Sequence, residues 1–209
     1  MSSRKGPTLP RRHCPSDVTQ RTALLWLVLG LFCGCASRDA TPVPLRDGEV
    51  VRVVNIVKGD ELTVAAGKGD ARVRMLGIQA FSAVVTNPQV QALSAGSVAA
   101  LKDLIGTASV KLIFDTPVQD SSGRYLAYVY KDDLDLNRRM LEEGWAVVYT
   151  EYPFGREADY LVIETKARLA RRNLWGLEPA AEIITGLRKQ WAEARRASQR
   201  TATADPLLP

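Results

Sequence analysis

The side chains available for chemistry in most of this chain are carboxylates, arginines, lysines and hydroxyls, because histidine and cysteine occur only near its start. The single histidine is His13, and the three cysteines are Cys14, Cys33 and Cys35. The residues after Cys35 therefore cannot form a Ser-His-Asp triad, a disulfide, a thiol nucleophile or the usual zinc cage of His and Cys.

One stretch, VRMLGIQAFS at residues 73–82, places an arginine just before an uncharged turn. Alternation in residues 70–78 predicts a strand with Arg72 and Arg74 on one face and Val73 and Met75 on the other. A guanidinium binds phosphate or carboxylate through paired hydrogen bonds. It does not activate water, which requires a base that this turn lacks.

The elements that would position this arginine follow from hydrophobic periodicity and turn residues. Five β-rich runs are predicted to form strands, at residues 50–57, 62–66, 70–78, 108–114 and 124–132. Helical spacing and end signals predict four helices, at residues 88–106, 138–144, 154–176 and 180–200. Asn137 is predicted to cap the second of these helices. Residues 201–209 are predicted to be a frayed tail.

Five local sequences together resemble the staphylococcal nuclease (thermonuclease) family over about residues 50–176. They are VVNIVKGDELTV, VRMLGI, DSSGRYLAYVY, DLNRRMLEEGWAVV and ETKARLARRNLWG. The resemblance implies a mainly β fold with α-helices (α+β). It would be a five-stranded barrel of the oligonucleotide-binding (OB) type, with three packed helices and an extra C-terminal helix.

The resemblance also implies a site. In that family two aspartates and a threonine carbonyl hold a divalent cation, typically calcium, while a glutamate activates water and two arginines neutralise the phosphate. Asp60 matches the first metal-binding aspartate, and Arg74 and Arg124 match the two arginines. Gln79 and Ser82 stand where the family has its second aspartate and its glutamate.

Residues 71–102 contain no Asp or Glu, so no shift of the alignment supplies the two carboxylates. Calcium prefers six to eight oxygen ligands, several of them anionic. We therefore expect no cofactor and a non-catalytic or weakly active module that binds phosphate or another anionic ligand. The alternative is a nuclease that hydrolyses phosphodiesters in DNA or RNA and depends on calcium or another divalent metal, and the sequence leaves open whether the protein is an enzyme.

The retained arginines have two interpretations of equal weight. Arg74 and Arg124 could form an anion clamp, or they could be structural and pair with Asp60, Asp120 or Glu61.

Three neighbouring residues are interpreted in simpler terms. Asp60 is interpreted as a turn residue rather than a metal ligand, and Glu61 as a solvated strand start rather than a replacement ligand. Phe81 is interpreted as a packing residue rather than a stacking platform for a base or sugar.

The N-terminal segment resembles a bacterial lipoprotein signal. An apolar run at residues 23–32 follows a basic region and leads into LFCGCAS, which predicts cleavage before Cys35 and lipidation of that cysteine. The alternatives are a conventional secretory signal or a retained anchor.

The predicted division of the chain is a signal peptide at 1–34, a tether at 35–48, the barrel domain at 49–177 and a C-terminal helix with a disordered tail at 178–209.

The charge distribution argues against a nucleic-acid track. The chain has a net charge of +5, but four of these charges lie before Cys35, and residues 50–176 hold 16 basic and 15 acidic residues. Such near-neutrality is a poor match to a protein that relies on phosphate contacts. We expect the protein to be located in the cell envelope, either on a membrane through the lipid anchor or in the periplasmic or extracellular space. Nucleic acid is a weakly supported partner, and an envelope protein partner is unspecified.

Overall fold

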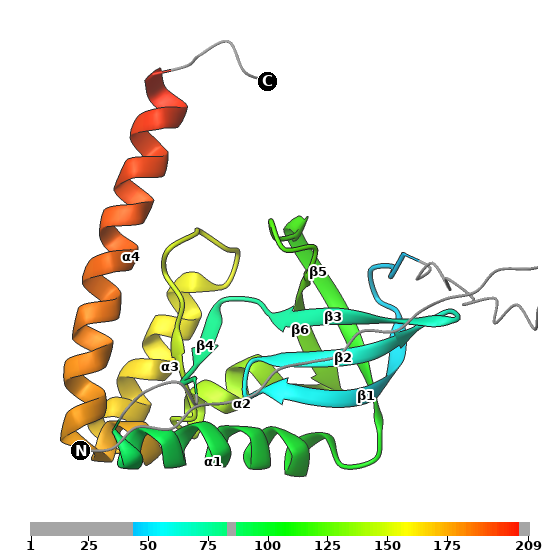
Figure 1. Cartoon of the computed structure of the whole chain (residues 1–209), viewed down its shortest axis with the longest axis horizontal. Coiled ribbons are helices and arrows are strands. Elements are labelled where there is room, and N and C mark those ends of the chain that lie inside the picture. Colours follow the sequence, from blue (N-terminus) through cyan, green and yellow to red (C-terminus); the bar gives the residue numbers. More distant parts are fainter. Residues whose placement is uncertain (1–43, 83–86, 205–209) are drawn as a thin grey trace, which may run out of the picture. The chain divides into compact units, whose positions relative to one another are not determined.

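The computed structural model describes residues 44–82 and 87–204, which form a β-barrel with four α-helices (Figure 1). The strands are β1 (Val50–Lys58), β2 (Glu61–Ala66), β3 (Gly69–Met75), β4 (Ile78–Ala80), β5 (Ser109–Gln119), β6 (Tyr125–Lys131), β7 (Leu134–Asp135) and β8 (Ala146–Val148). The helices are α1 (Pro88–Ile105), α2 (Leu136–Glu142), α3 (Glu157–Leu169), the 3₁₀-helix η1 (Asn173–Gly176) and α4 (Glu178–Ala204). The predicted signal, Cys35 and most of the predicted tether lie outside the described residues.

Five strands close into a barrel. The sheet order is β3-β2-β1-β5-β6, and β3 also pairs with β6 in parallel, which joins the two edges. This closure confirms the predicted five-stranded barrel of the OB type. The closing pairs are Val73 with Tyr125, Arg74 with Leu126 and Met75 with Ala127, so the barrel is sealed at the strand that carries Arg74.

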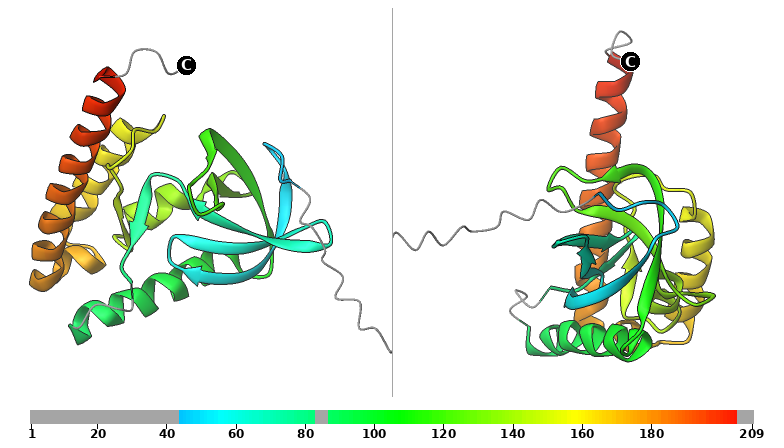
Figure 2. Two further views of the ribbon diagram at one scale, coloured as in Figure 1. Left: turned by 45° about the horizontal axis from the view of Figure 1, so that its top comes forward. Right: turned by 90° about the vertical axis from the view of Figure 1, so that its right-hand side faces the viewer.

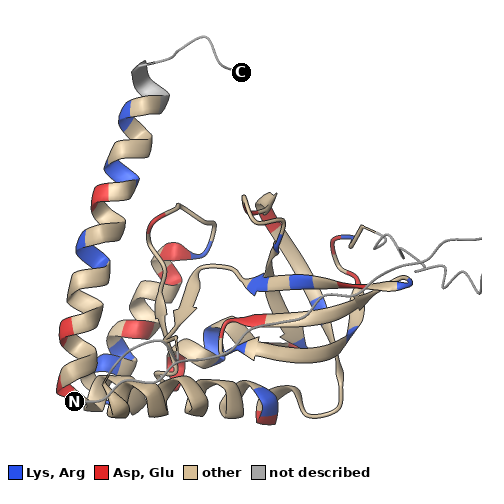
Figure 3. Ribbon diagram, viewed as in Figure 1, with Lys and Arg blue, Asp and Glu red and all other residues tan. Residues whose placement is uncertain are grey.

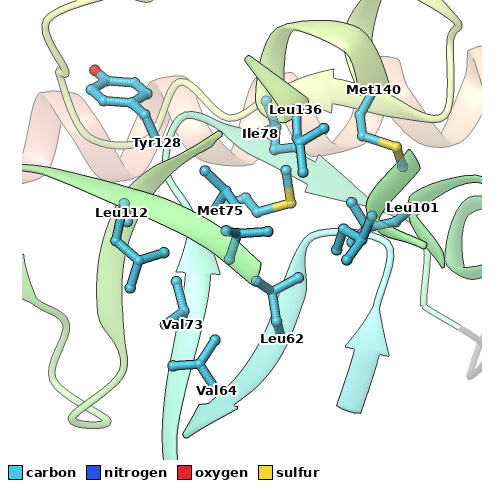
Figure 4. Packing of buried hydrophobic residues seen from close by; sticks show 14 of the residues in the cluster. Leu62, Val64, Val73, Met75, Ile78, Leu101, Leu112, Tyr128, Leu136 and Met140 are labelled. Atoms are coloured by element: carbon cyan, nitrogen blue, oxygen red, sulfur yellow. The ribbon is translucent and has the colours of Figure 1, made fainter. Parts of the chain in front are cut away.

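The interior is filled by alternate residues of the strands, as the period of two requires. Leu62 and Val64 from β2 and Val73 and Met75 from β3 are fully buried and meet Leu112 from β5 (Figure 4). The outward residues between them are polar, and Arg72 and Arg74 lie on the predicted common face.

Helix α1 covers one end of the barrel and packs against β1 (Figures 1 and 2). Its start is defined by Asn87, whose side chain accepts hydrogen bonds from the backbone of Gln89 and Val90, and by Pro88 in the first turn. It ends at Gly106, which has a φ of 61°. Pro88 and Gly106 were the predicted ends of this helix, and the predicted helix is confirmed.

A second apolar cluster lies beside the barrel and holds α4 in place. It joins Val90 and Leu93 of α1 to Phe81, Val147, Leu174 and three residues of α4, which are Ala180, Ile184 and Trp191. The packing interpretation of Phe81 is confirmed. Helix α4 continues to Ala204, four residues into the segment predicted to be a tail. Residues 196–201 are exposed, and this end of the helix extends past the barrel (Figure 2).

The predicted strand at 70–78 is interrupted, because the chain turns at Gly77, whose φ is 76°. A Cβ atom there would lie 2.3 Å from the ring of Phe154, so only glycine fits. The following residues form β4, which pairs with β8 in a separate two-stranded sheet. The sequence did not predict β8.

The prediction that Asn137 caps α2 is wrong. Asp135 is the cap, and its Oδ1 accepts a hydrogen bond from the backbone N–H of Arg138 at 3.0 Å. Asn137 is instead fully buried. Asparagine and aspartate have similar cap preferences, and only the path of the chain over the barrel separates their roles.

Within residues 44–82 and 87–204, no helix is both long and apolar enough to span a bilayer.

Candidate functional site

The barrel mouth brings together the residues that the sequence singled out. Glu61 at the start of β2 lies opposite Arg74 of β3, and Arg74 lies opposite Leu126 of β6. Arg124 directly precedes β6, and the carbonyl of Asp60 accepts a hydrogen bond from Met75 at 2.9 Å. Strand register and barrel closure therefore bring Asp60, Glu61, Arg74 and Arg124 close together at the barrel mouth.

Glu61 is the centre of an ion-pair network, so its interpretation as a solvated strand start is wrong. Its side chain is 1% exposed. Nε of Arg72 donates to Oε1 at 2.8 Å, and Nη1 of Arg124 donates to Oε2 at 3.0 Å. Burial opposes ionisation of Glu61, but the hydrogen bonds from the two arginines outweigh it and lower the pKa of this carboxyl.

Arg124 has a structural pairing, as one of the two interpretations expected. Besides Glu61 it binds Asp120, with Nε to Oδ2 at 2.8 Å and Nη2 to Oδ2 at 2.7 Å. Asp120 also accepts hydrogen bonds from the backbone of Ser122 and Arg124. Arg124 therefore has two carboxylate partners, and its guanidinium forms its ion pairs within the protein.

Arg74 differs from the other arginines of the mouth. Its Nη2 donates only a long hydrogen bond, 3.4 Å, to Oε1 of Gln79, and its guanidinium carbon lies 4.6 Å from the ring centre of Tyr149. In the described part of the chain no carboxylate forms an ion pair with Arg74. Its close neighbours are a neutral amide and an aromatic face, and its charge interacts with the Asp60 carboxyl without forming an ion pair.

Asp60 occupies the turn between β1 and β2, as predicted, but it is 5% exposed. Burial raises the pKa of this carboxyl, although Arg74, Lys58 and the backbone N–H of Ala80 act in the opposite direction. Oδ1 of Asp60 has no hydrogen-bond partner among the described residues. A buried acceptor without a partner is costly and points to a ligand or a proton.

Gln79 and Ser82 flank a small cavity of about 170 Å³. Its walls are mainly apolar and come from β4 and the two residues after it, from β8 and from α4. They consist of Gln79, Ala80, Phe81, Ser82, Val147, Ile183 and Leu187. Neither Gln79 nor Ser82 brings a charge to the site.

The residues present do not fit the calcium ion that the family resemblance implies. Glu61 is bound by two arginines, Asp60 has a raised pKa, and Gln79 offers only a neutral oxygen. Over residues 44–82 and 87–204, no group of three or more His, Cys, Asp or Glu side chains could hold a metal ion. The expectation of no cofactor is consistent with this donor set but is not tested by it.

Sequence reasoning did not identify Tyr149 or the role of Arg72. Tyr149 reaches Arg74 because β4 pairs with β8 and because its N–H donates to the carbonyl of Gly77 at 3.0 Å. No local pattern indicates that contact. Arg72 did carry a signal, because alternation placed it beside Arg74, but its partner Glu61 comes from the neighbouring strand.

Comparison with known proteins agrees with this geometry. Residues 72–176 match the model of the family described as staphylococcal nuclease homologue. A thermonuclease of Staphylococcus intermedius is 30% identical over 99 residues, 47% of this chain and 59% of that protein. An uncharacterized endonuclease of Escherichia coli O157:H7 is 28% identical over 125 residues, 59% of this chain and 75% of the relative. The match with a thermonuclease of Staphylococcus hyicus is 23% over 128 residues, 61% of this chain and 76% of that protein.

The chain thus spans less than two thirds of the S. intermedius thermonuclease. The family match covers half of this chain, includes both arginines, the second half of β3 and all of β6, and ends before α4. The barrel, the order of its strands and this match lead to one conclusion: the chain belongs to the family of staphylococcal nuclease homologues.

Proposed function

We propose that this nuclease-type domain is a non-catalytic or weakly active module that binds phosphate or a similar anion at Arg74. The observation that carries the proposal is the difference between the arginines. Arg72 and Arg124 form ion pairs with Glu61 and Asp120. In the described structure Arg74 forms no ion pair: it has a long hydrogen bond to Gln79, a contact with a tyrosine ring and a longer-range interaction with the charge of Asp60. A guanidinium that forms no ion pair within the protein can donate its hydrogen bonds to the carboxylate or phosphate of a ligand.

The charge of the mouth supports anion binding. Lys58, Arg72, Arg74 and Arg124 face Glu61, Asp120 and Asp60. Basic and acidic residues elsewhere are interspersed over the barrel strands and α4 (Figure 3). The four basic residues of the mouth outnumber its three acidic ones, so the mouth has a local positive excess that attracts anions.

Hydrolysis is expected to be slow because the groups it requires are uncharged or engaged. A phosphodiester repels hydroxide, so its cleavage needs a base and cations near the phosphorus. Loss of a general base costs about 10²–10⁴-fold in rate. Gln79 and Ser82 cannot act as that base at neutral pH, and Glu61 is held by Arg72 and Arg124.

Replacing Arg74 by alanine is expected to weaken binding of inorganic phosphate about 10- to 100-fold, because hydrogen bonds to charged groups contribute about 1.5–3 kcal/mol. Isothermal titration calorimetry on the full chain in detergent measures this change. Arg138→Ala is the control, because Arg138 is paired with Glu142 on the surface of α2. Equal affinities of wild type and Arg74→Ala would contradict the proposal.

The second candidate is a divalent-metal-dependent nuclease. The unpartnered Oδ1 of Asp60 beside Arg74 favours it, as do the relatives named thermonuclease and endonuclease. The same proteins are to be incubated with single-stranded DNA or RNA and calcium. Cleavage that is lost both with chelator and in Arg74→Ala would establish this function in place of the first.

We further propose that the protein is exported to the cell envelope and anchored to a membrane by lipid on Cys35. Cys35→Ser is expected to abolish incorporation of labelled palmitate in cells and to leave the signal uncleaved. Cys33→Ser, two residues earlier, is the matched control and is expected to be lipidated normally. Label retained in Cys35→Ser would refute Cys35 as the lipidation site, and absence of label in the wild type would refute the anchor.

A further inference from the structure

Helix α4 contacts the ring on which Arg74 rests. Trp191 of α4 packs edge-on against Tyr149, with ring centres 5.0 Å apart and planes at 81°. The guanidinium of Arg74 lies 4.6 Å from the centre of the same ring, and the Tyr149 hydroxyl donates a hydrogen bond to Glu151 at 2.7 Å. An unbroken series of side-chain contacts therefore runs from α4 through Tyr149 to the site arginine.

The same face of α4 also holds the backbone on both sides of Tyr149. On one side Arg188 pairs with Glu164, whose Oε1 accepts a hydrogen bond from the N–H of Val148 at 2.9 Å. On the other side Arg195 donates to the carbonyl of Thr150 at 3.2 Å.

Residues 188, 191 and 195 are spaced three and four apart, so they share one helix face. Residues 148–150 are thus held by successive side chains of α4: Arg188 through Glu164, then Trp191, then Arg195.

These contacts are buried rather than incidental. Trp191 is 5% exposed and Glu164 is 3% exposed. Arg195 also pairs with Glu157 of α3 at 2.7 Å, so α4 is joined to α3 by a second ion pair. An element with this much buried polar and apolar contact is part of the domain, although it lies beyond residue 176, where the family match ends.

We propose that Trp191 is a positioning residue of the anion site, holding Tyr149 so that its ring supports Arg74. What Arg74 binds rests on the proposed function above, but the placement of Arg74 does not. An arginine side chain is flexible, and a ring that restrains it lowers the entropy lost when an anion binds. The site is then built from the family barrel and the C-terminal helix together.

The placement is tested without any ligand, by NMR of arginine-labelled full chain in detergent. Protons above an aromatic ring are shifted upfield, so Arg74 side-chain signals are expected upfield in the wild type and not in Tyr149→Leu. Trp191→Leu is expected to lose most of this shift. The matched control is Ile184→Ala, a truncation in the same helix and cluster that has no ring to pair with Tyr149.

Trp191→Phe keeps an aromatic edge and is expected to restore the Arg74 shift in part. An Arg74 shift in Trp191→Leu equal to that of the wild type would overturn the proposal. So would an equal loss in Trp191→Leu and Ile184→Ala, because the effect would then be one of general packing.

Phosphate binding supplies the second readout. Loss of a cation–π contact predicts about 2- to 5-fold weaker binding in Trp191→Leu, and no further loss when Arg74 is already alanine. If the wild type binds no phosphate, the proposed function fails while the NMR result still decides the role of Trp191. If Arg74→Ala alone loses affinity and Trp191→Leu does not, the positioning role fails and the anion site stands.

Discussion

Replacing Asn137 by alanine is expected to lower the free energy of unfolding by about 3–4 kcal/mol. Its Oδ1 accepts from the N–H of Val129 at 2.9 Å, and its Nδ2 donates to the carbonyls of Leu76 at 2.9 Å and Ala127 at 3.2 Å. The Ala127 carbonyl keeps another donor, the N–H of Leu76. The truncation therefore removes partners from two other buried backbone groups and leaves a small void.

The hydrogen bonds of Asn137 join the two strands that close the barrel, so the expected loss of stability reports on barrel closure. Leu76 follows β3 and Ala127 belongs to β6, the two strands whose parallel pairing seals the barrel next to Arg74. Urea unfolding of Asn137→Ala measures the loss. Asn55→Ala, an exposed asparagine on β1, is the control and is expected to change stability by less than about 0.5 kcal/mol. Similar stabilities of the two variants would contradict this account.

Glu61→Gln is expected to cost about 2–3 kcal/mol of stability at neutral pH. The amide retains one acceptor oxygen, but its NH₂ group faces a guanidinium that needs an acceptor. The cost is less than that of stranding a fully buried charge, because Arg72 is 56% exposed and Arg124 keeps Asp120.

Glu142 provides a matched comparison, because it also pairs with two arginines, Arg138 and Arg139, but is 29% exposed. Surface pairs contribute about 0–1 kcal/mol, so Glu142→Gln is expected to have a small effect. If the two substitutions cost the same, burial does not strengthen the Glu61 network.

The contribution of Glu61 depends on pH in a direction that its pKa sets. Its pKa in the folded protein lies below the ordinary glutamate value of 4.5, so the stabilisation is fully present above 4.5. It is lost as pH falls through the lower, folded pKa. The stability difference between wild type and Glu61→Gln, followed by urea titrations, is therefore expected to shrink as the pH is lowered below 4.5. A difference that stays constant down to acid unfolding would contradict the ionised pairing.

The sequence by itself determined the scaffold and the location of the site. Strand alternation, the helix start at Pro88 and the helix end at Gly106 are local features, because backbone geometry alone sets a period of two or 3.6 residues. The sequence alone also shows that residues 71–102 contain no acidic residue. The resemblance to the nuclease family then brought Asp60, Arg74 and Arg124 to one barrel mouth.

Only the tertiary structure decided how these residues are partnered. Glu61 looked like a surface residue until β2 and β3 paired, and Asn137 looked like a cap until the barrel closed beneath it. Tyr149 contacts Arg74 from 75 residues further along the chain, and Trp191, 117 residues beyond Arg74, contacts Tyr149.

The physical reason is that hydrogen bonds and ion pairs act over a few ångströms. A side chain's partners are therefore set by strand register, barrel closure and helix docking. Those long-range contacts leave no periodic pattern in the sequence, so they decide which arginine is neutralised and which one stays available to an anion.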